Sequence, residues 1–205
     1  MKSGNFTEGW FWQLKDTKVR ASKAKPDDGV FIDVGGWIGD TSLPTAAVGI
    51  DTYVFEPVRF NFNLIHISML LNDCMISEHL TIVNALVGNN NTITKVFNPI
   101  DHSVTDQSSG IEANIPSETE VSEVGMVKLD SFFPAGTKVQ HLKIDVQGFE
   151  FEVIKGAERL LRENMGRLKM RFEKGPRDRD RAIVDFMNNL GYNVIARGGG
   201  DIDME

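Results

Sequence analysis

One acid, three glycines and a second acid have the spacing of a cofactor-binding site. An apolar run leads through Asp33 into a turn that contains Gly35, Gly36 and Gly39, and about one βα unit later a second apolar run ends in Glu56. Glycines let the backbone approach a ligand closely, because a Cβ would clash there. Glu56 can accept hydrogen bonds from both hydroxyls of a ribose. The pair therefore predicts a nucleoside-bearing cofactor at the edge of a parallel sheet.

The glycine spacing distinguishes between cofactors. A dinucleotide fold needs Gly-x-Gly-x-x-Gly so that the pyrophosphate can lie on a helix N-terminus, whereas Trp37 occupies the middle of this turn. The carboxylate of Asp33 would repel a diphosphate, but it suits the ammonium and sulfonium groups of S-adenosylmethionine (SAM). SAM is therefore the favoured cofactor. A nicotinamide or flavin cofactor and a purely structural βα turn are the alternatives.

The composition limits the classes of partner. The chain has 205 residues, enough for one α/β domain, and a formal net charge of −7, which argues against nucleic acid because phosphate binding needs a basic surface. It has no apolar stretch of about 18 residues, so no membrane span is expected. Its single cysteine, Cys74, rules out an internal disulfide and fits a reducing compartment. We therefore expect a cytoplasmic protein.

The apolar pattern predicts a short N-terminal segment followed by one domain. Residues 1–28 are read as an amphipathic helical segment that packs on the domain or covers the cofactor cleft, and residues 29–205 as the domain itself. The polar stretch 98–122 is read as a long loop. We expect strands at 30–34, 52–55, 80–83, 92–97, 124–129, 139–144, 168–172 and 192–196, and helices at 40–48, 58–72, 149–164 and 180–190.

Alternating strands and helices predict an α/β fold: a three-layer, doubly wound, mostly parallel sheet. Ligands of such sheets bind beyond the carboxyl ends of the strands, where the strand order reverses. Five polar residues stand at predicted carboxyl ends, which makes one shared site the economical hypothesis: Asp33, Glu56, Asn84, Asp145 and Glu173.

In their order along the chain, five segments resemble the FkbM family of SAM-dependent methyltransferases. They are residues 31–43, 54–57, 83–88, 127–131 and 142–150, of which Lys143-Ile-Asp-Val-Gln-Gly-Phe-Glu150 is the most specific. The resemblance runs from about residue 28 to about residue 196. It implies a class I SAM-methyltransferase fold of the Rossmann-like type, with transfer of a methyl group to an oxygen of a saccharide or another small metabolite.

The resemblance also assigns roles to residues of the cofactor site. Asp33 and the three glycines would surround the methionine end of SAM. Thr41, at a helix start, would bind the SAM carboxylate, and Glu56 would hold the ribose. Asn84 and Ala85 would lie beside the adenine.

Asp145 would lie at the reaction end, as general base for the acceptor hydroxyl or as a group that stabilises the surroundings of the sulfonium. Gln147, Glu150 and Glu173 are further candidates for acceptor contacts. Among the histidines, His102 in the polar stretch is the best candidate base. The sequence has no spaced His/Cys set for zinc, and no metal site is assigned. A divalent cation held by acidic side chains is the less favoured alternative.

Two departures from the family pattern bear on activity. Gln147 stands where the family often has an acid, which removes a potential base or metal ligand. A class I sheet also needs a seventh strand after residue 196, and the glycine-rich, acidic tail predicts that this strand is missing or truncated. A SAM-binding module without turnover is therefore one alternative function. A nicotinamide-dependent oxidoreductase is a second, although the chain has no Tyr-x-x-x-Lys pair.

Overall fold

The computed structural model describes residues 28–72, 74–99, 119–198 and 200–205. The predicted N-terminal helical segment, apart from its last residue, and the candidate base His102 lie outside the described residues. Within the described part no helix is long and apolar enough to cross a membrane.

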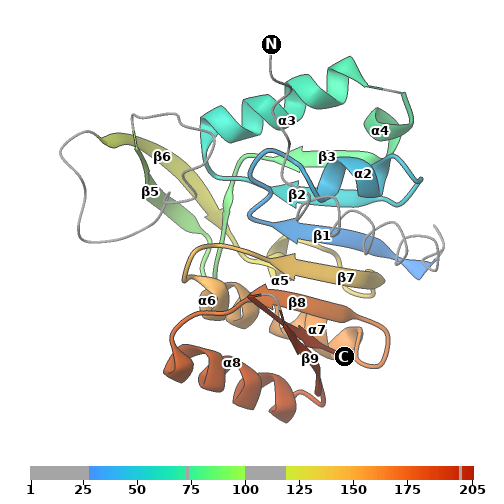
Figure 1. The fold of residues 1–205 in the computed structure, drawn as a ribbon, viewed down its shortest axis with the longest axis vertical. Helices are drawn as coiled ribbons and strands as arrows, with labels where there is room; N and C mark the ends of the chain where they lie inside the picture. The colour runs from blue at the N-terminus through green and yellow to red at the C-terminus, as the bar shows by residue number, and fades with distance from the viewer. Residues whose placement is uncertain (1–27, 73, 100–118, 199) are drawn as a thin grey trace, which may run out of the picture.

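The main sheet has seven strands in the order β3-β2-β1-β7-β8-β10-β9 (Figure 1). Its strands are β1 (Val30–Val34), β2 (Thr52–Phe55), β3 (Leu80–Val83), β7 (Val139–Ile144), β8 (Lys169–Glu173), β9 (Val194–Gly198) and β10 (Asp201–Met204). Every neighbouring pair is parallel except those of β10, which runs antiparallel to both β8 and β9. The strand order reverses between β1 and β7, which is where an α/β sheet binds its ligands.

The prediction that the last strand is missing is wrong. The acidic tail forms β10, which inserts between β8 and β9 and pairs Ile202 with Phe172 and with Arg197. Gly200 has φ +101°, a conformation that glycine adopts without strain, and so the chain can reverse tightly after β9. Ile202 and Met204 are buried, whereas Asp201 and Asp203 alternate with them toward the opposite face. The acids therefore belong to a strand with one charged face.

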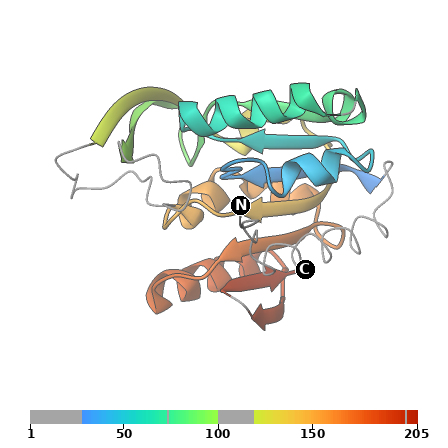
Figure 2. The same cartoon turned by 45° about the horizontal axis from the view of Figure 1, so that its top comes forward.

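Helices cover the two faces of the sheet with separate apolar clusters. α2 (Ser42–Ala46), α3 (Arg59–Leu71) and α4 (Cys74–His79) pack through Ala46, Ile65 and Ile76 against β2 and β3. In Figure 2, α3 (teal) lies along the side of the sheet where these two strands form its edge. The other face packs against α5 (Leu129–Phe132), α6 (Glu150–Lys155), α7 (Glu158–Glu163) and α8 (Arg177–Asn189). This arrangement confirms the predicted three-layer, doubly wound architecture.

The predicted helix 149–164 is two helices, α6 and α7, which are interrupted at Gly156. A Cβ on Gly156 would lie 1.9 Å from the carbonyl oxygen of Gly88, so the chain approaches a neighbouring strand exit too closely for any other residue. The carboxylate of Asp130 then accepts the N–H groups of Arg159 and Leu160, each at 2.9 Å, at the start of α7. The apolar periodicity does not reveal this break, because apolar residues line one face of both helices.

A second sheet of three strands, in the order β4-β6-β5, extends away from the main sheet (Figure 1). It consists of β4 (Leu86–Val87), β5 (Thr92–Pro99) and β6 (Thr119–Val127). The predicted strand 124–129 therefore starts earlier and ends earlier, and α5 follows it. Of the predicted loop 98–122, residues 98–99 and 119–122 are paired in β5 and β6, and residues 100–118 are not described.

One face of the main sheet carries a row of charged side chains across four strands. The register places Asp33 beside Lys143, Lys143 beside Arg171, and Arg171 beside Asp203. Arg171 forms a two-point ion pair with Asp203, with N···O distances of 2.7 and 3.1 Å. Each cation therefore has an acid on one side, and such cross-strand pairs stabilise a sheet. This row lies next to the carboxyl ends of β1, β7 and β8.

Candidate cofactor and acceptor site

Glycines allow the turn after β1 to press against both neighbouring strands. A Cβ on Gly35 would lie 1.9 Å from the carbonyl oxygen of Asp145, and one on Gly36 would lie 2.0 Å from Cγ2 of Val54. The N–H groups of both glycines donate to the carbonyl of Phe55, at 3.0 and 3.2 Å. Packing within the protein therefore already requires these two glycines, apart from any ligand.

Asp33 lies near the end of β1, just before this turn, and has no exposed surface. Its Oδ1 accepts a hydrogen bond from Nζ of Lys143 at 3.1 Å. Burial raises the pKa of Asp33 to about 6 against the lowering effect of Lys143. Among the described residues, its Oδ2 is buried without a hydrogen-bond partner. A buried polar atom of this kind is rare in folded proteins and calls for an explanation.

Lys143 connects the turn to Asp145, which the resemblance assigns to the reaction end, and the sequence analysis missed this lysine. Besides Asp33, its Nζ donates to the carbonyl of Gly35 at 3.2 Å and lies 3.9 Å from Oδ2 of Asp145. Burial disfavours the charged form of Lys143, but the carboxylates of Asp33, Asp145 and Asp40 outweigh it and raise the pKa. The available signal was a cation in a strand that pairs with β1, because its register places Lys143 beside Asp33 on the same face of the sheet.

Glu56 is buried at the end of β2, and 4% of its surface is exposed. Its carboxylate accepts the N–H groups of Trp37 at 2.8 Å and Val58 at 2.9 Å. Burial raises the pKa of Glu56 to about 7, although these two hydrogen bonds and one from Asn61 act in the opposite direction. Trp37 has φ +47°, so the turn after β1 takes a left-handed conformation where it meets this carboxylate.

Asn84, assigned to the adenine by resemblance, holds the backbone of the Glu56 turn. Its Nδ2 donates to the carbonyls of Glu56 at 2.9 Å and Pro57 at 3.0 Å. The neighbouring Ala85 is buried. Thr41 begins α2 without a side-chain cap, and α2 has five residues. The dipole of so short a helix is small, so any contact of Thr41 with a carboxylate would depend on its own hydroxyl and N–H.

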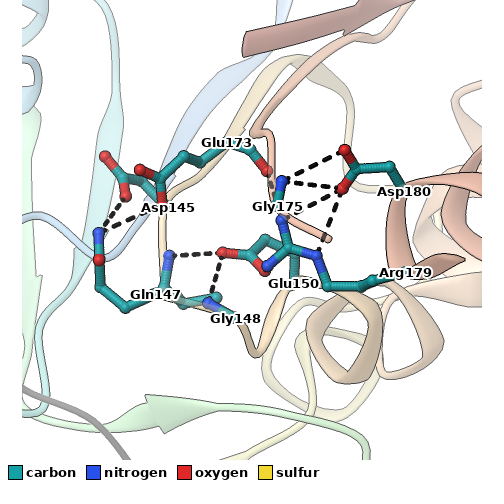
Figure 3. A network of polar contacts seen from close by, with 9 residues as sticks. Asp145, Gln147, Gly148, Glu150, Glu173, Gly175, Arg179 and Asp180 are labelled. Carbon is teal, nitrogen blue, oxygen red and sulfur yellow. Dashed lines mark hydrogen bonds and ion pairs between the residues drawn. The ribbon is translucent and has the colours of Figure 1, made fainter. Parts of the chain in front are cut away.

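The structure brings Asp145 and Glu173, the residues that the resemblance assigns to the acceptor, together at one amide. Nε2 of Gln147 donates to Oδ1 of Asp145 at 3.1 Å and to Oε2 of Glu173 at 3.3 Å (Figure 3). Both acids stand at the carboxyl ends of adjacent strands, β7 and β8. Partial burial and the nearby carboxylates of Asp145 and Glu150 raise the pKa of Glu173 to about 7. Glu173 can therefore exchange a proton near neutral pH.

Glu150, a candidate for acceptor contacts in the sequence, is fully buried and has another function. Its Oε1 accepts the N–H groups of Gly148 at 3.0 Å and Val146 at 3.3 Å, and its Oε2 pairs with Arg179. Arg179 also donates to the carbonyl of Glu173 at 2.9 Å. The ion pair thus fixes the turn after β7 relative to the end of β8 (Figure 3). In the described ranges no group of three or more His, Cys, Asp or Glu side chains has the arrangement of a metal site.

The positions predicted to share one site are thus connected through a continuous set of contacts. Asn84 supports the Glu56 turn, Glu56 holds the turn after β1, and Lys143 joins that turn to Asp145. Gln147 joins Asp145 to Glu173. These contacts follow the carboxyl ends of strands β3, β2, β1, β7 and β8 in order.

Comparison with known proteins identifies the family. A family model described as the methyltransferase FkbM domain matches residues 33–194. The crystal structure of methyltransferase FkbM from Methylobacillus flagellatus KT superimposes with a TM-score of 0.60 at 16% identity. That match covers 87% of this chain and 43% of that protein, so the chain spans less than half of the length of this relative. No curated protein matches the chain by sequence.

Two further structures share the fold. Magnesium protoporphyrin IX methyltransferase from Synechocystis PCC 6803, solved with bound SAM, has a TM-score of 0.52 at 10% identity, covering 100% of this chain and 85% of that one. Precorrin-6y C5,15-methyltransferase from Geobacter metallireducens GS-15 has a TM-score of 0.50 at 13% identity, covering 93% and 85%. At these identities the likeness shows the class I methyltransferase fold.

Proposed function

Because the chain belongs to the family of FkbM methyltransferase domains, we propose that it binds SAM and transfers the methyl group to a hydroxyl of a saccharide or another small metabolite. The set of contacts from Glu56 through Lys143 to Glu173 carries this proposal. These contacts join the turn after β1, which would hold the cofactor, to a pair of carboxylates at the same edge of the sheet, near the point where the strand order reverses.

The residues of the turn fit SAM in charge and in hydrogen-bonding capacity. The buried Oδ2 of Asp33, which has no hydrogen-bond partner among the residues that the structure describes, would accept a hydrogen bond from the ammonium group of the cofactor. Glu56 is held by two backbone N–H groups, so its carboxylate is oriented before a ribose binds. Prior orientation lowers the entropy cost of binding. A diphosphate would instead face two buried acids.

Bound SAM supplies an electrophilic methyl group with a good leaving group, and the protein positions the acceptor and removes its proton. A hydroxyl is a weak nucleophile until its proton is accepted. A base contributes most when its pKa lies near the working pH. Glu173, with a pKa of about 7, meets that condition, and Asp145 adjoins it through Gln147. In this proposal the acceptor proton moves to the Asp145–Glu173 pair as the methyl group is transferred.

A panel of acceptors tests this reaction. Saccharides, hydroxylated metabolites and matched amines and thiols are incubated with SAM, and formation of S-adenosylhomocysteine is followed. We expect acceptor-dependent product with hydroxyl compounds, and at least about 10²-fold less with Asp145→Asn or Glu173→Gln, the usual loss for a general base. Product with amines alone would contradict transfer to oxygen. SAM binding without product from any acceptor would favour a SAM-binding module without turnover. Of the two sequence features that suggested such a module, the missing last strand no longer applies, because β10 is present in the sheet.

A further inference from the structure

The turn after β7 holds Gln147 in an unusual backbone conformation. Gln147 has φ +53° and the following Gly148 has φ +105°. A left-handed conformation is uncommon for residues other than glycine, asparagine and aspartate, and it is worth explaining where it occurs. The buried carboxylate of Glu150 fixes the turn by accepting the N–H groups of Val146 and Gly148 on either side. In this turn the Gln147 side chain reaches the end of β8 as well as Asp145, which directly follows β7.

This conformation brings one amide nitrogen to two carboxylates from different strands. Nε2 of Gln147 lies 3.1 Å from Oδ1 of Asp145 and 3.3 Å from Oε2 of Glu173 (Figure 3). An amide NH₂ has two hydrogens, one for each acid, and an ionised carboxylate can only accept. Two carboxylates on neighbouring strands would otherwise repel each other. The carboxyl groups of Asp145 and Glu173 are also in hydrogen-bonding contact with each other, and the amide contacts one oxygen of each acid from beside the pair, as a bridging cation would.

We propose that Gln147 is a positioning residue that holds Asp145 and Glu173 against each other and occupies the position beside both acids that a divalent cation would need. The proposal rests on the proposed function only in assigning the two acids to the acceptor end. The amide engages one oxygen of each acid and leaves Asp145 Oδ2, 3.9 Å from Lys143, outside the bridge. An acid at position 147 would instead add a third carboxylate, and hard cations bind to several oxygen ligands.

Three variants separate this positioning role from a role in folding. Gln147→Met keeps the length of the side chain and removes the donor. Gln147→Gly also removes the donor but fits the left-handed backbone without strain. Gln147→Glu is nearly isosteric and supplies the third acid. The probes are the ¹³C carboxyl resonances of the protein without SAM, titration with Mn²⁺ alone, thermal unfolding and SAM binding.

We expect the Met and Gly variants to shift the carboxyl resonances of Asp145 and Glu173 and to leave those of Asp33 and Glu56 in place. The Gly variant should unfold at or above the temperature of the wild-type protein. Gln147→Glu should bind Mn²⁺ at least about tenfold more tightly than the wild type, because the charge and number of oxygen ligands set the affinity for hard cations.

Two results would overturn the proposal. Unchanged resonances of Asp145 and Glu173 in both donor-free variants would show that the amide does not hold them, and equal Mn²⁺ affinity in the wild type and Gln147→Glu would show that it does not fill the cation position. Neither reading needs SAM or an acceptor. If the wild type failed to bind SAM, the proposed function would be wrong, but the carboxyl resonances and the Mn²⁺ affinities would still test the role of Gln147.

Discussion

Replacing Glu56 with Gln should change stability and cofactor binding in opposite directions. Burial raises the pKa of Glu56 from its usual 4.5 to about 7. That rise corresponds to a loss of about 3 kcal/mol of folding free energy above pH 7, because a shift of one pH unit in pKa is worth about 1.4 kcal/mol. A neutral amide avoids this loss. It can accept only one of the N–H groups of Trp37 and Val58, and the unmatched one costs about 1–2 kcal/mol.

The net effect is a stabilisation of about 1–2 kcal/mol at pH 8, or a rise of about 4 °C in unfolding temperature for a domain of this size. The sign of the pH dependence follows from the raised pKa of Glu56. The wild-type carboxyl is neutral in the folded state below pH 7 and in the unfolded state below about pH 4.5, so the gain from removing the charge falls through this window. Because the cost of the unmatched N–H group remains, the net advantage of Gln disappears near about pH 5–6. SAM should bind about 1–3 kcal/mol more weakly, the cost of an unmatched hydrogen-bonding group.

Urea unfolding at pH 8 and pH 5, with calorimetry of SAM binding, measures both effects. Glu78→Gln, at an exposed position on α4, is the matched control and should change neither. The reasoning would be refuted if Glu56→Gln were less stable than the wild type at pH 8, or if it bound SAM with unchanged affinity.

Three further predictions concern the acceptor end and the sheet. Turnover of the wild type should rise with pH through about 7, where Glu173 loses its proton, and Glu173→Gln should remove this rise; a rise that persists in the variant would assign it to another group. Arg179→Met should destabilise the fold by about 3 kcal/mol or more in a denaturant titration, because it leaves the buried carboxylate of Glu150 unpaired. The double variant with Glu150→Gln should recover part of this loss, and no recovery would contradict the pairing. Ile202→Ala should cost about 2–5 kcal/mol, as for other buried large-to-small changes; thermal unfolding near wild type would mean that β10 does not contribute to the core.

The apolar pattern predicted most of the main sheet because these strands are buried. The expected strand 139–144 coincides with β7, and the expected helix 58–72 differs from α3 by one residue at each end. The pattern failed where tertiary contacts or charge decide the structure. β10 alternates apolar and acidic residues, and its acids face Arg171, whose position only the sheet register defines. In the small sheet the expected strands 92–97 and 124–129 contain the buried Val96 and Val124, whereas the paired ends at 98–99 and 119–122 were missed because they are largely polar.

The candidate site could be predicted as a set of positions but not as a set of contacts. Strand ends placed Asp33, Glu56, Asp145 and Glu173 at one edge, and the structure connects them there. The connecting residue Lys143 was missed because a single lysine in a strand is ordinarily read as exposed. Glu150 and Arg179 lie 29 residues apart, and their pairing depends on how α8 packs beside α6. Sequence spacing carries no information about such a contact.

Calorimetry of SAM binding tests the central claim most directly, with NADH and Glu56→Ala as controls. The account predicts micromolar binding of SAM, binding weakened by roughly 1–3 kcal/mol in the variant, and no comparable binding of NADH. Well-folded protein that binds NADH in place of SAM, or that binds SAM equally well without the Glu56 carboxylate, would contradict it.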